Sequence, residues 1–141
     1  MENTLILYPM FALVLWTFFV GALQARYTKR AVLEGLHPDY FRHKLGYEPP
    51  HYLLSVTQHF NNLFEMPVLF YGGVLTVYIT GTNNIALLAL AWAYVFTRLL
   101  HSRQHLADRH LLKRRNTFFA SYFVLMVFWL VTMVTIAIRQ V

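Results

Sequence analysis

The chain has 141 residues, of which 57% are hydrophobic and only 13% are charged, about half the charged fraction of a soluble domain. This composition excludes an ordinary soluble domain and predicts one integral membrane domain over residues 1–141. The sequence has no cysteine, which excludes disulfides, a protein thiolate nucleophile and sulfur-ligated metal sites.

Four apolar segments predict four membrane-spanning helices, and therefore an all-α, integral membrane four-helix bundle. The predicted spans cover about residues 5–25, 54–79, 85–106 and 116–138. The first follows a head that carries Glu2 and no basic residue, so we expect a retained anchor rather than a signal peptide. Pro67 should kink the second span because proline lacks a backbone N–H. Thr80–Asn84 is a turn signal between the second and third spans.

The basic residues are split unevenly between the two ends of the predicted bundle. All twelve lysines and arginines except Arg139 lie on the side of the two long connections, about 26–51 and 102–115. The positive-inside rule therefore predicts cytoplasmic connections and two non-cytoplasmic termini. The net charge of +6 comes mostly from the basic residues that set this topology. We expect no nucleic-acid partner, because nucleic-acid binding would need a basic face on a soluble domain.

Glu65 and Arg98 flank an uncharged stretch that is too short for two spans unless both charges lie inside the bilayer. Each lies about 20 Å along a helix from the Thr80–Asn84 turn, and so roughly 10 Å inside the opposite face of the bilayer. Charged residues at this depth are costly and by default indicate a functional site. We expect the two side chains to pair.

Further polar residues fall at the same level. Gln58, Asn62 and Glu65 share one predicted helical stripe, and Tyr94, Arg98, His101 and His105 share another. Arg26 and Arg114 reach the same level from the first and fourth spans. Together they predict a mainly cationic cleft at the cytoplasmic end, which would suit a small polyanionic ligand because arginine binds carboxylates in a bidentate manner.

Each residue also has a simpler interpretation. Glu65 and Arg98 could form only a structural ion pair, Arg114 and Arg115 could be interfacial residues that reach to the lipid headgroups, and His105 could be merely hydrated. Asn62 could bond across helices without a ligand. A metal site at His101 and His105 is disfavoured because di-iron membrane enzymes need more histidines in several boxes. A proton-coupled exporter is disfavoured because its membrane glutamate would need to be free of an arginine.

The strings Asn62–Tyr71 and Arg98–His105, together with the basic start of the fourth span at Arg114, resemble the MAPEG family, the membrane-associated proteins in eicosanoid and glutathione metabolism. The resemblance is greatest to the bacterial branch and extends over essentially the whole chain. It implies a homotrimer in the bacterial inner membrane, in contact with membrane lipids, with glutathione bound between subunits as a cosubstrate. It further implies a transferase or peroxidase that acts on a hydrophobic small molecule.

The resemblance also implies roles for individual residues. By position, the expected glutathione contacts are Arg26, Asn62, Glu65, Arg98, His101 and His105, and no metal is expected. Arg114 is the expected catalytic residue, because a cation near the sulfur favours the nucleophilic thiolate. Arg115 should point about 100° away around the helix.

The chain also departs from the glutathione-active members of the family. Those members usually have arginines where this chain has Gln58 and Asn61. Because some members bind lipid without catalysis, the alternative is a non-catalytic membrane protein of the same fold that binds a lipid or a protein partner.

Overall fold

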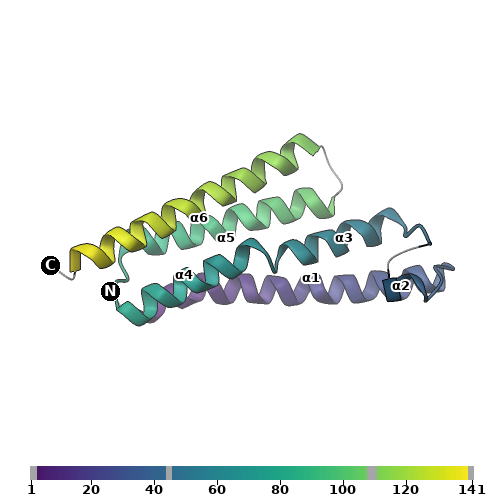
Figure 1. Ribbon diagram of the computed structural model, residues 1–141, viewed down its shortest axis with the longest axis horizontal. Helices are drawn as coiled ribbons and strands as arrows, with labels where there is room; N and C mark the ends of the chain where they lie inside the picture. The colour runs from purple at the N-terminus through teal and green to yellow at the C-terminus, as the bar shows by residue number, and fades with distance from the viewer. Residues whose placement is uncertain (1–2, 44–45, 108–110, 140–141) are drawn as a thin grey trace.

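The computed structural model describes residues 3–43, 46–107 and 111–139, and all regular structure within them is helical. The elements are η1 (Asn3–Ile6), α1 (Leu7–Leu33), α2 (Tyr40–His43), α3 (His51–Asn62), α4 (Met66–Thr80), α5 (Ile85–Leu106) and α6 (Leu111–Arg139) (Figure 1). The all-α prediction is therefore confirmed.

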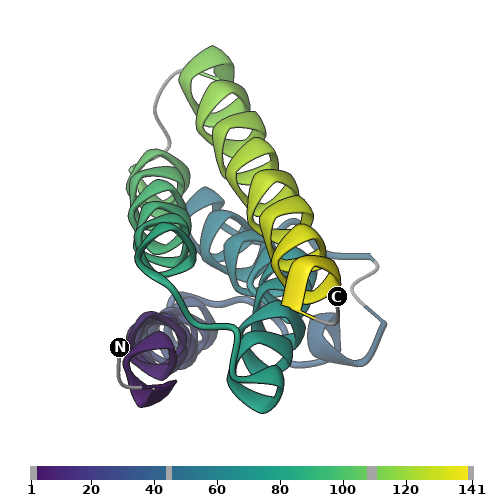
Figure 2. The ribbon, with the colours of Figure 1, turned by 90° about the vertical axis from the view of Figure 1, so that its left-hand side faces the viewer.

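Within the described ranges, four helical segments are long and apolar enough to cross a membrane. They are Asn3–Leu33, His51–Thr80, Ile85–Leu106 and Leu112–Arg139, so the chain is a multi-pass membrane protein. Figure 1 shows both ends of the chain and the α4–α5 turn at one end of the bundle, and α2 with the C-terminal end of α1 at the other. Figure 2 looks along the bundle and shows α6 tilted against its neighbours. α1 extends to Leu33, well past the predicted end of the first span near residue 25.

The second span is broken into α3 and α4 at the point where the sequence predicts a kink. Pro67 has no N–H to give to the carbonyl of Leu63, and it occupies the first turn of α4, where an N–H is not needed. α3 ends in tight turns in which the backbone N–H of Leu63 bonds to Phe60 O at 3.1 Å and that of Phe64 to Asn61 O at 2.9 Å. The break changes the helical register after Asn62, so residues on either side of it no longer share one stripe.

The turn between α4 and α5 follows the prediction for Thr80–Asn84. Gly81 ends α4 with φ 64°, a left-handed conformation that glycine adopts without steric cost. Asn84 caps α5, its side chain accepting a hydrogen bond from the backbone N–H of Leu87 at 2.9 Å. Arg139 of α6 donates to the carbonyls of Thr80 and Gly81, at the C-terminal end of α4.

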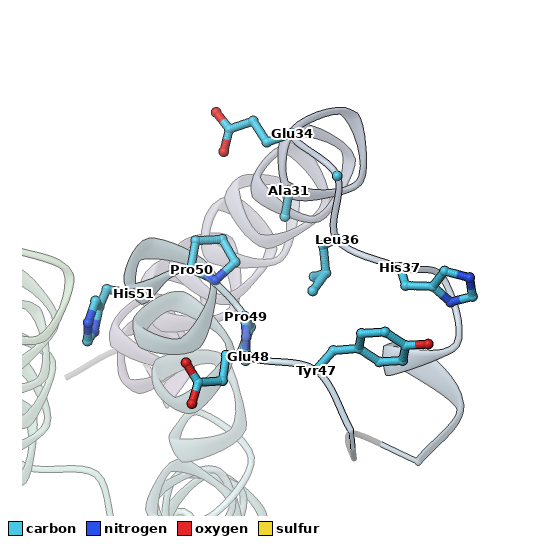
Figure 3. A pocket seen from close by; sticks show the side chains of 10 residues that line it. Ala31, Glu34, Leu36, His37, Tyr47, Glu48, Pro49, Pro50 and His51 are labelled. Atoms are coloured by element: carbon cyan, nitrogen blue, oxygen red, sulfur yellow. The ribbon is translucent and has the colours of Figure 1, made fainter.

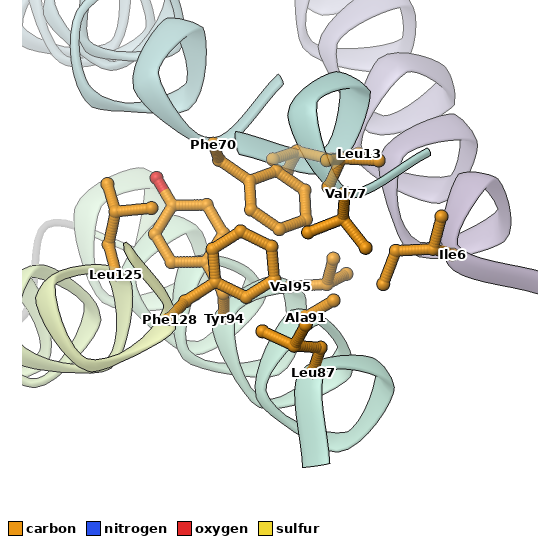
Figure 4. Close-up of a cluster of buried hydrophobic side chains, with 11 residues drawn as sticks. Ile6, Leu13, Phe70, Val77, Leu87, Ala91, Tyr94, Val95, Leu125 and Phe128 are labelled. Carbon is orange, nitrogen blue, oxygen red and sulfur yellow. The ribbon is translucent and has the colours of Figure 1, made fainter. Parts of the chain in front are cut away.

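A hydrophobic core holds the half of the bundle nearest this turn (Figure 4). The rings of Phe70, Tyr94 and Phe128 lie together at its centre, with 4.5 Å between the ring centroids of Phe70 and Tyr94. Gly73 lets α4 approach α6, because a Cβ there would lie 2.7 Å from the ring of Phe128. This packing fixes α5 against α1 and α6 and so determines which of its faces is buried.

Candidate functional site

The buried face of α5 carries the polar stripe predicted from the sequence. Its members are Tyr94, Arg98, His101 and His105, all at most 3% exposed. Neighbouring helices hold this face in place through hydrogen bonds. Ser102 accepts from Trp16 Nε1 at 2.9 Å, and Ser55 Oγ donates to the carbonyl of His105 at 2.8 Å. α1 and α3 thus fix the orientation of α5 at the level where its polar groups lie.

Arg98 is fully buried and caps the broken end of α3. Its Nη2 donates to the carbonyl oxygen of Asn62 at 3.0 Å. A helix leaves its last carbonyls without intrahelical partners and carries a partial negative charge there, so a guanidinium is a favourable cap. Nε and Nη1 of Arg98 have no hydrogen-bond partner among the described residues.

The expected ion pair between Glu65 and Arg98 is not formed. The ion pairs of the described residues are Arg30–Glu34, His37–Asp39 and Arg42–Asp39. Glu65 lies in the break between α3 and α4, with φ −96° and ψ −91°, and its side chain is exposed. The sequence pattern predicts one helical stripe for Asn62 and Glu65, but α3 ends at Asn62. Arg98 donates to the carbonyl of Asn62 at this break and not to Glu65.

A pocket of about 470 Å³ lies between the end of α3, the end of α5 and the start of α6. Its lining residues are Asn62, His101, His105, Arg114, Arg115, Phe118 and Phe119. Four residues predicted for the site, Asn62, His101, His105 and Arg114, therefore meet at one pocket. Arg98 does not line this pocket. Its guanidinium contacts the pocket residue Asn62 by a hydrogen bond to the backbone carbonyl.

The prediction that Arg115 points away from the site is wrong. Arg115 lines the same pocket as Arg114. Arg114 is half-buried and Arg115 is exposed. Two long side chains on adjacent residues can bend towards one cavity even though their Cα–Cβ bonds diverge by about 100°. The pocket therefore has two guanidinium groups on its α6 wall.

The first turn of α6 concentrates positive charge beside this pocket. It contains Lys113 and Arg114, with Arg115 following, and it holds no acidic residue. The N-terminal end of a helix also carries a partial positive charge, which attracts anions. His101 is tied to this turn, its Nδ1 lying 3.2 Å from the carbonyl of Arg114 and 3.3 Å from Thr117 Oγ1. The wall made by α6 is therefore suited to an anionic ligand.

Arg26 and Glu65 are not brought to this pocket. Both side chains are exposed, Arg26 on α1 and Glu65 between α3 and α4, and neither is in the pocket lining. α1 continues beyond Arg26 to Leu33, so Arg26 lies within the helix.

His59 lies beside His101 and His105, although it does not line the pocket, and it was missed by the sequence analysis. It is 0% exposed, and its ring centroid lies 5.2 Å from that of His105 and 6.1 Å from that of His101. The three imidazoles form a cluster between α3 and α5. The available signal was spacing, because His59 continues the buried stripe of Leu53 and Val56 on α3. No group of three or more His, Asp or Glu side chains in the described ranges is placed to hold a metal ion.

A second hollow of about 510 Å³ lies among the residues that join α1 to α3 (Figure 3). Its lining carries the carboxylates of Glu34 and Glu48 and, among the described residues, no lysine or arginine. The hydroxyl of Tyr52, which donates to Glu34 at 2.5 Å, and the guanidinium of Arg30 hold the pKa of Glu34 below its ordinary value. The carboxylate is therefore ionised at neutral pH, and this hollow is unsuited to a polyanion.

Comparison with known proteins gives one family. A family model described as MAPEG family matches residues 6–134, which is most of the chain and includes every residue of the pocket. No curated protein matches the chain.

Proposed function

Because the chain belongs to the MAPEG family, we propose that it is a glutathione-dependent membrane transferase or peroxidase that acts on hydrophobic electrophiles or lipid hydroperoxides. The observation that carries this proposal is the pocket at the start of α6, in which two arginines, two imidazoles and an amide lie beside two phenylalanines. Such a pocket can hold a polar anionic thiol next to an apolar substrate that reaches it from the membrane.

Glutathione suits this pocket in both size and charge. Ligand pockets commonly measure about 300–1,000 Å³, and this one is about 470 Å³. Glutathione has two carboxylates and one ammonium, and the described residues of the pocket lining have two guanidinium groups and no carboxylate. In this proposal Arg114, the half-buried arginine, stabilises the thiolate, while Asn62 and the imidazoles of His101 and His105 bond to the peptide groups. A thiol cosubstrate also supplies the nucleophile that a chain without cysteine lacks.

The chemistry needs only the thiol and the second substrate. With an electrophile, the thiolate sulfur attacks carbon, a thioether bond forms, and the leaving group departs with the bonding electrons while the thiol proton passes to water. With a hydroperoxide, the sulfur takes the terminal oxygen and the O–O bond breaks to give the alcohol. A second glutathione then converts the sulfenic acid to the disulfide and water. The protein holds the sulfur as its thiolate and excludes bulk water.

We further propose that the subunits form a homotrimer, with the outer apolar faces of the spans in contact with membrane lipids. Arg26 and Glu65 are exposed charges on membrane-spanning segments, which are costly when they face lipid. An interface between subunits would remove them from lipid and could bring them to a pocket of the neighbouring subunit.

The binding proposal predicts that glutathione stabilises the detergent-purified protein against heat. A ligand that binds only the folded state contributes RT ln(1 + [L]/Kd), so the melting temperature should rise steadily with glutathione concentration. An equimolar mixture of glutamate and glycine at matched ionic strength is the control and should give no comparable rise. No shift at millimolar glutathione would contradict the enzyme and favour a non-catalytic binding protein of this fold.

The proposed orientation predicts which sites an impermeant thiol reagent can reach in intact cells. The chain has no cysteine of its own, so single cysteines report cleanly. Thr4→Cys, at the end with both termini, should be labelled, and Glu48→Cys, in the α1–α3 connection, should be labelled only after permeabilisation. Both positions are exposed in the structure. The reverse labelling pattern would place the pocket on the side away from cytosolic glutathione.

A further inference from the structure

We propose that Arg115 binds the glycine carboxylate of glutathione, beside the sulfur that Arg114 stabilises; this inference rests on the proposed function of the pocket. Arg114 and Arg115 are adjacent on α6 and both line the pocket. Arg114 is half-buried, whereas Arg115 is exposed. The two guanidinium groups can thus reach two different parts of one ligand.

The charge at the start of α6 favours an anion at this wall. Lys113, Arg114 and Arg115 are consecutive cations at the positive end of a long helix, and the first turn has no acidic residue to offset them. Like charges in this arrangement repel one another and the helix dipole. A ligand carboxylate at Arg115 would relieve that repulsion, and it could form two parallel hydrogen bonds to one guanidinium.

The two ends of glutathione differ in charge, and this decides which end faces Arg115. The γ-glutamyl end carries a carboxylate and an ammonium, whereas the glycine end carries only a carboxylate. Two adjacent guanidinium groups repel an ammonium, so the glycine end suits the α6 wall. The γ-glutamyl end then lies towards Asn62 on α3, whose side-chain amide can both donate and accept hydrogen bonds.

The proposed role of Arg115 is to bind, not to act on the sulfur. The charge of the glycine carboxylate does not change as the thiolate reacts, so Arg115 stabilises the ground state and the transition state equally. Interactions of this kind affect KM and leave kcat unchanged. The expected kinetic effect of Arg115 therefore differs from that of Arg114, whose interaction with the glutathione sulfur strengthens as the sulfur becomes charged.

Calorimetric titration of the detergent-purified protein tests the role of Arg115. The two probes are glutathione and its glycine ethyl ester, which lacks only the carboxylate in question. Wild-type protein should bind glutathione about tenfold more tightly than the ester, the scale of one charge-assisted contact. Arg115→Ala should bind glutathione about tenfold more weakly than wild type and should show no preference over the ester. Arg115→Gln, which keeps the length of the side chain, should behave like Arg115→Ala.

Lys113→Ala is the matched control, because it removes the same charge from the same turn at a residue that does not line the pocket. It should keep the preference for glutathione. If Arg115→Ala and Arg115→Gln, both shown to be folded by their melting curves, keep the wild-type preference, the role of Arg115 is wrong and glutathione binding stands. If Lys113→Ala loses the preference for glutathione to the same extent, the effect is a general one of positive charge, and the proposed role of Arg115 is also wrong. A wild-type protein that binds neither probe overturns the proposed function, and this inference with it.

Discussion

Arg114→Ala is expected to lower kcat for glutathione conjugation by about 100-fold, the scale for removing one electrostatic donor from a reacting centre. The half-buried guanidinium lies in a pocket that is also lined by Phe118 and Phe119. Because its interaction strengthens as the sulfur becomes a reactive thiolate, the loss should fall on turnover more than on glutathione affinity. Steady-state kinetics with a hydrophobic aryl halide, together with the calorimetric Kd, measure the two effects separately.

Lys113→Ala replaces Arg115→Ala as the control for this experiment, since Arg115 lines the pocket and Lys113 does not. Its kcat should stay within about twofold of wild type, a difference that corresponds to less than 0.5 kcal/mol. If Arg114→Ala retains wild-type turnover, Arg114 has no role at the sulfur and is an interfacial residue only.

Arg98→Ala is expected to destabilise the folded protein by about 2–5 kcal/mol. Arg98 is the largest of the fully buried side chains, so truncation leaves a cavity, and it also strips the carbonyl of Asn62 of its donor. Arg98→Met fills most of the cavity but leaves the carbonyl unpaired, so it should cost about 1–3 kcal/mol. Equilibrium unfolding in mixed detergent measures both variants. Arg103→Ala, on the exposed face of α5, should stay within about 0.5 kcal/mol of wild type.

A double-mutant cycle with Pro67→Ala tests whether Arg98→Ala destabilises the protein because Arg98 caps the broken end of α3. Alanine at 67 restores a backbone N–H, which lets α3 continue into α4 and gives the last carbonyls of α3 helical partners. Arg98→Ala should then cost less in the Pro67→Ala background than in wild type, with a coupling of about 0.5–3 kcal/mol. Strict additivity of the two changes would mean that Arg98 does not act as the cap of a broken helix.

Local patterns in the sequence were enough for the fold and for half of the site. Apolar segments of the right length predict the four spans, and Pro67 and Gly81 mark where the second span breaks and ends. The stripe from Tyr94 to His105 was predicted correctly because α5 is continuous, so a spacing of 3.6 residues per turn holds along it. Wherever one regular helix carries the residues, spacing alone decides which of them share a face.

The remaining features depend on changes of register and on packing that spacing does not encode. Glu65 was misplaced because the break before it rotates the chain, and a proline predicts a kink without its direction. Arg115 was misplaced because a long flexible side chain can reach a cavity that its Cα–Cβ bond does not face. His59 was missed because a histidine on an apolar stripe is recognised as part of a cluster only when the opposite helix is known.

The contact between Arg98 and Asn62 bears on how the chain enters the membrane during synthesis. The two inner spans are less apolar than the outer two, and each carries a polar group that the other satisfies. An arginine near the middle of a lone helix adds about 2.5–3.5 kcal/mol to the free energy of insertion, and an unpaired carbonyl adds to it. The turn that joins α4 to α5 is short. The second and third spans are therefore expected to leave the translocon together as a helical hairpin, with the guanidinium already on the carbonyl when lipid first surrounds them.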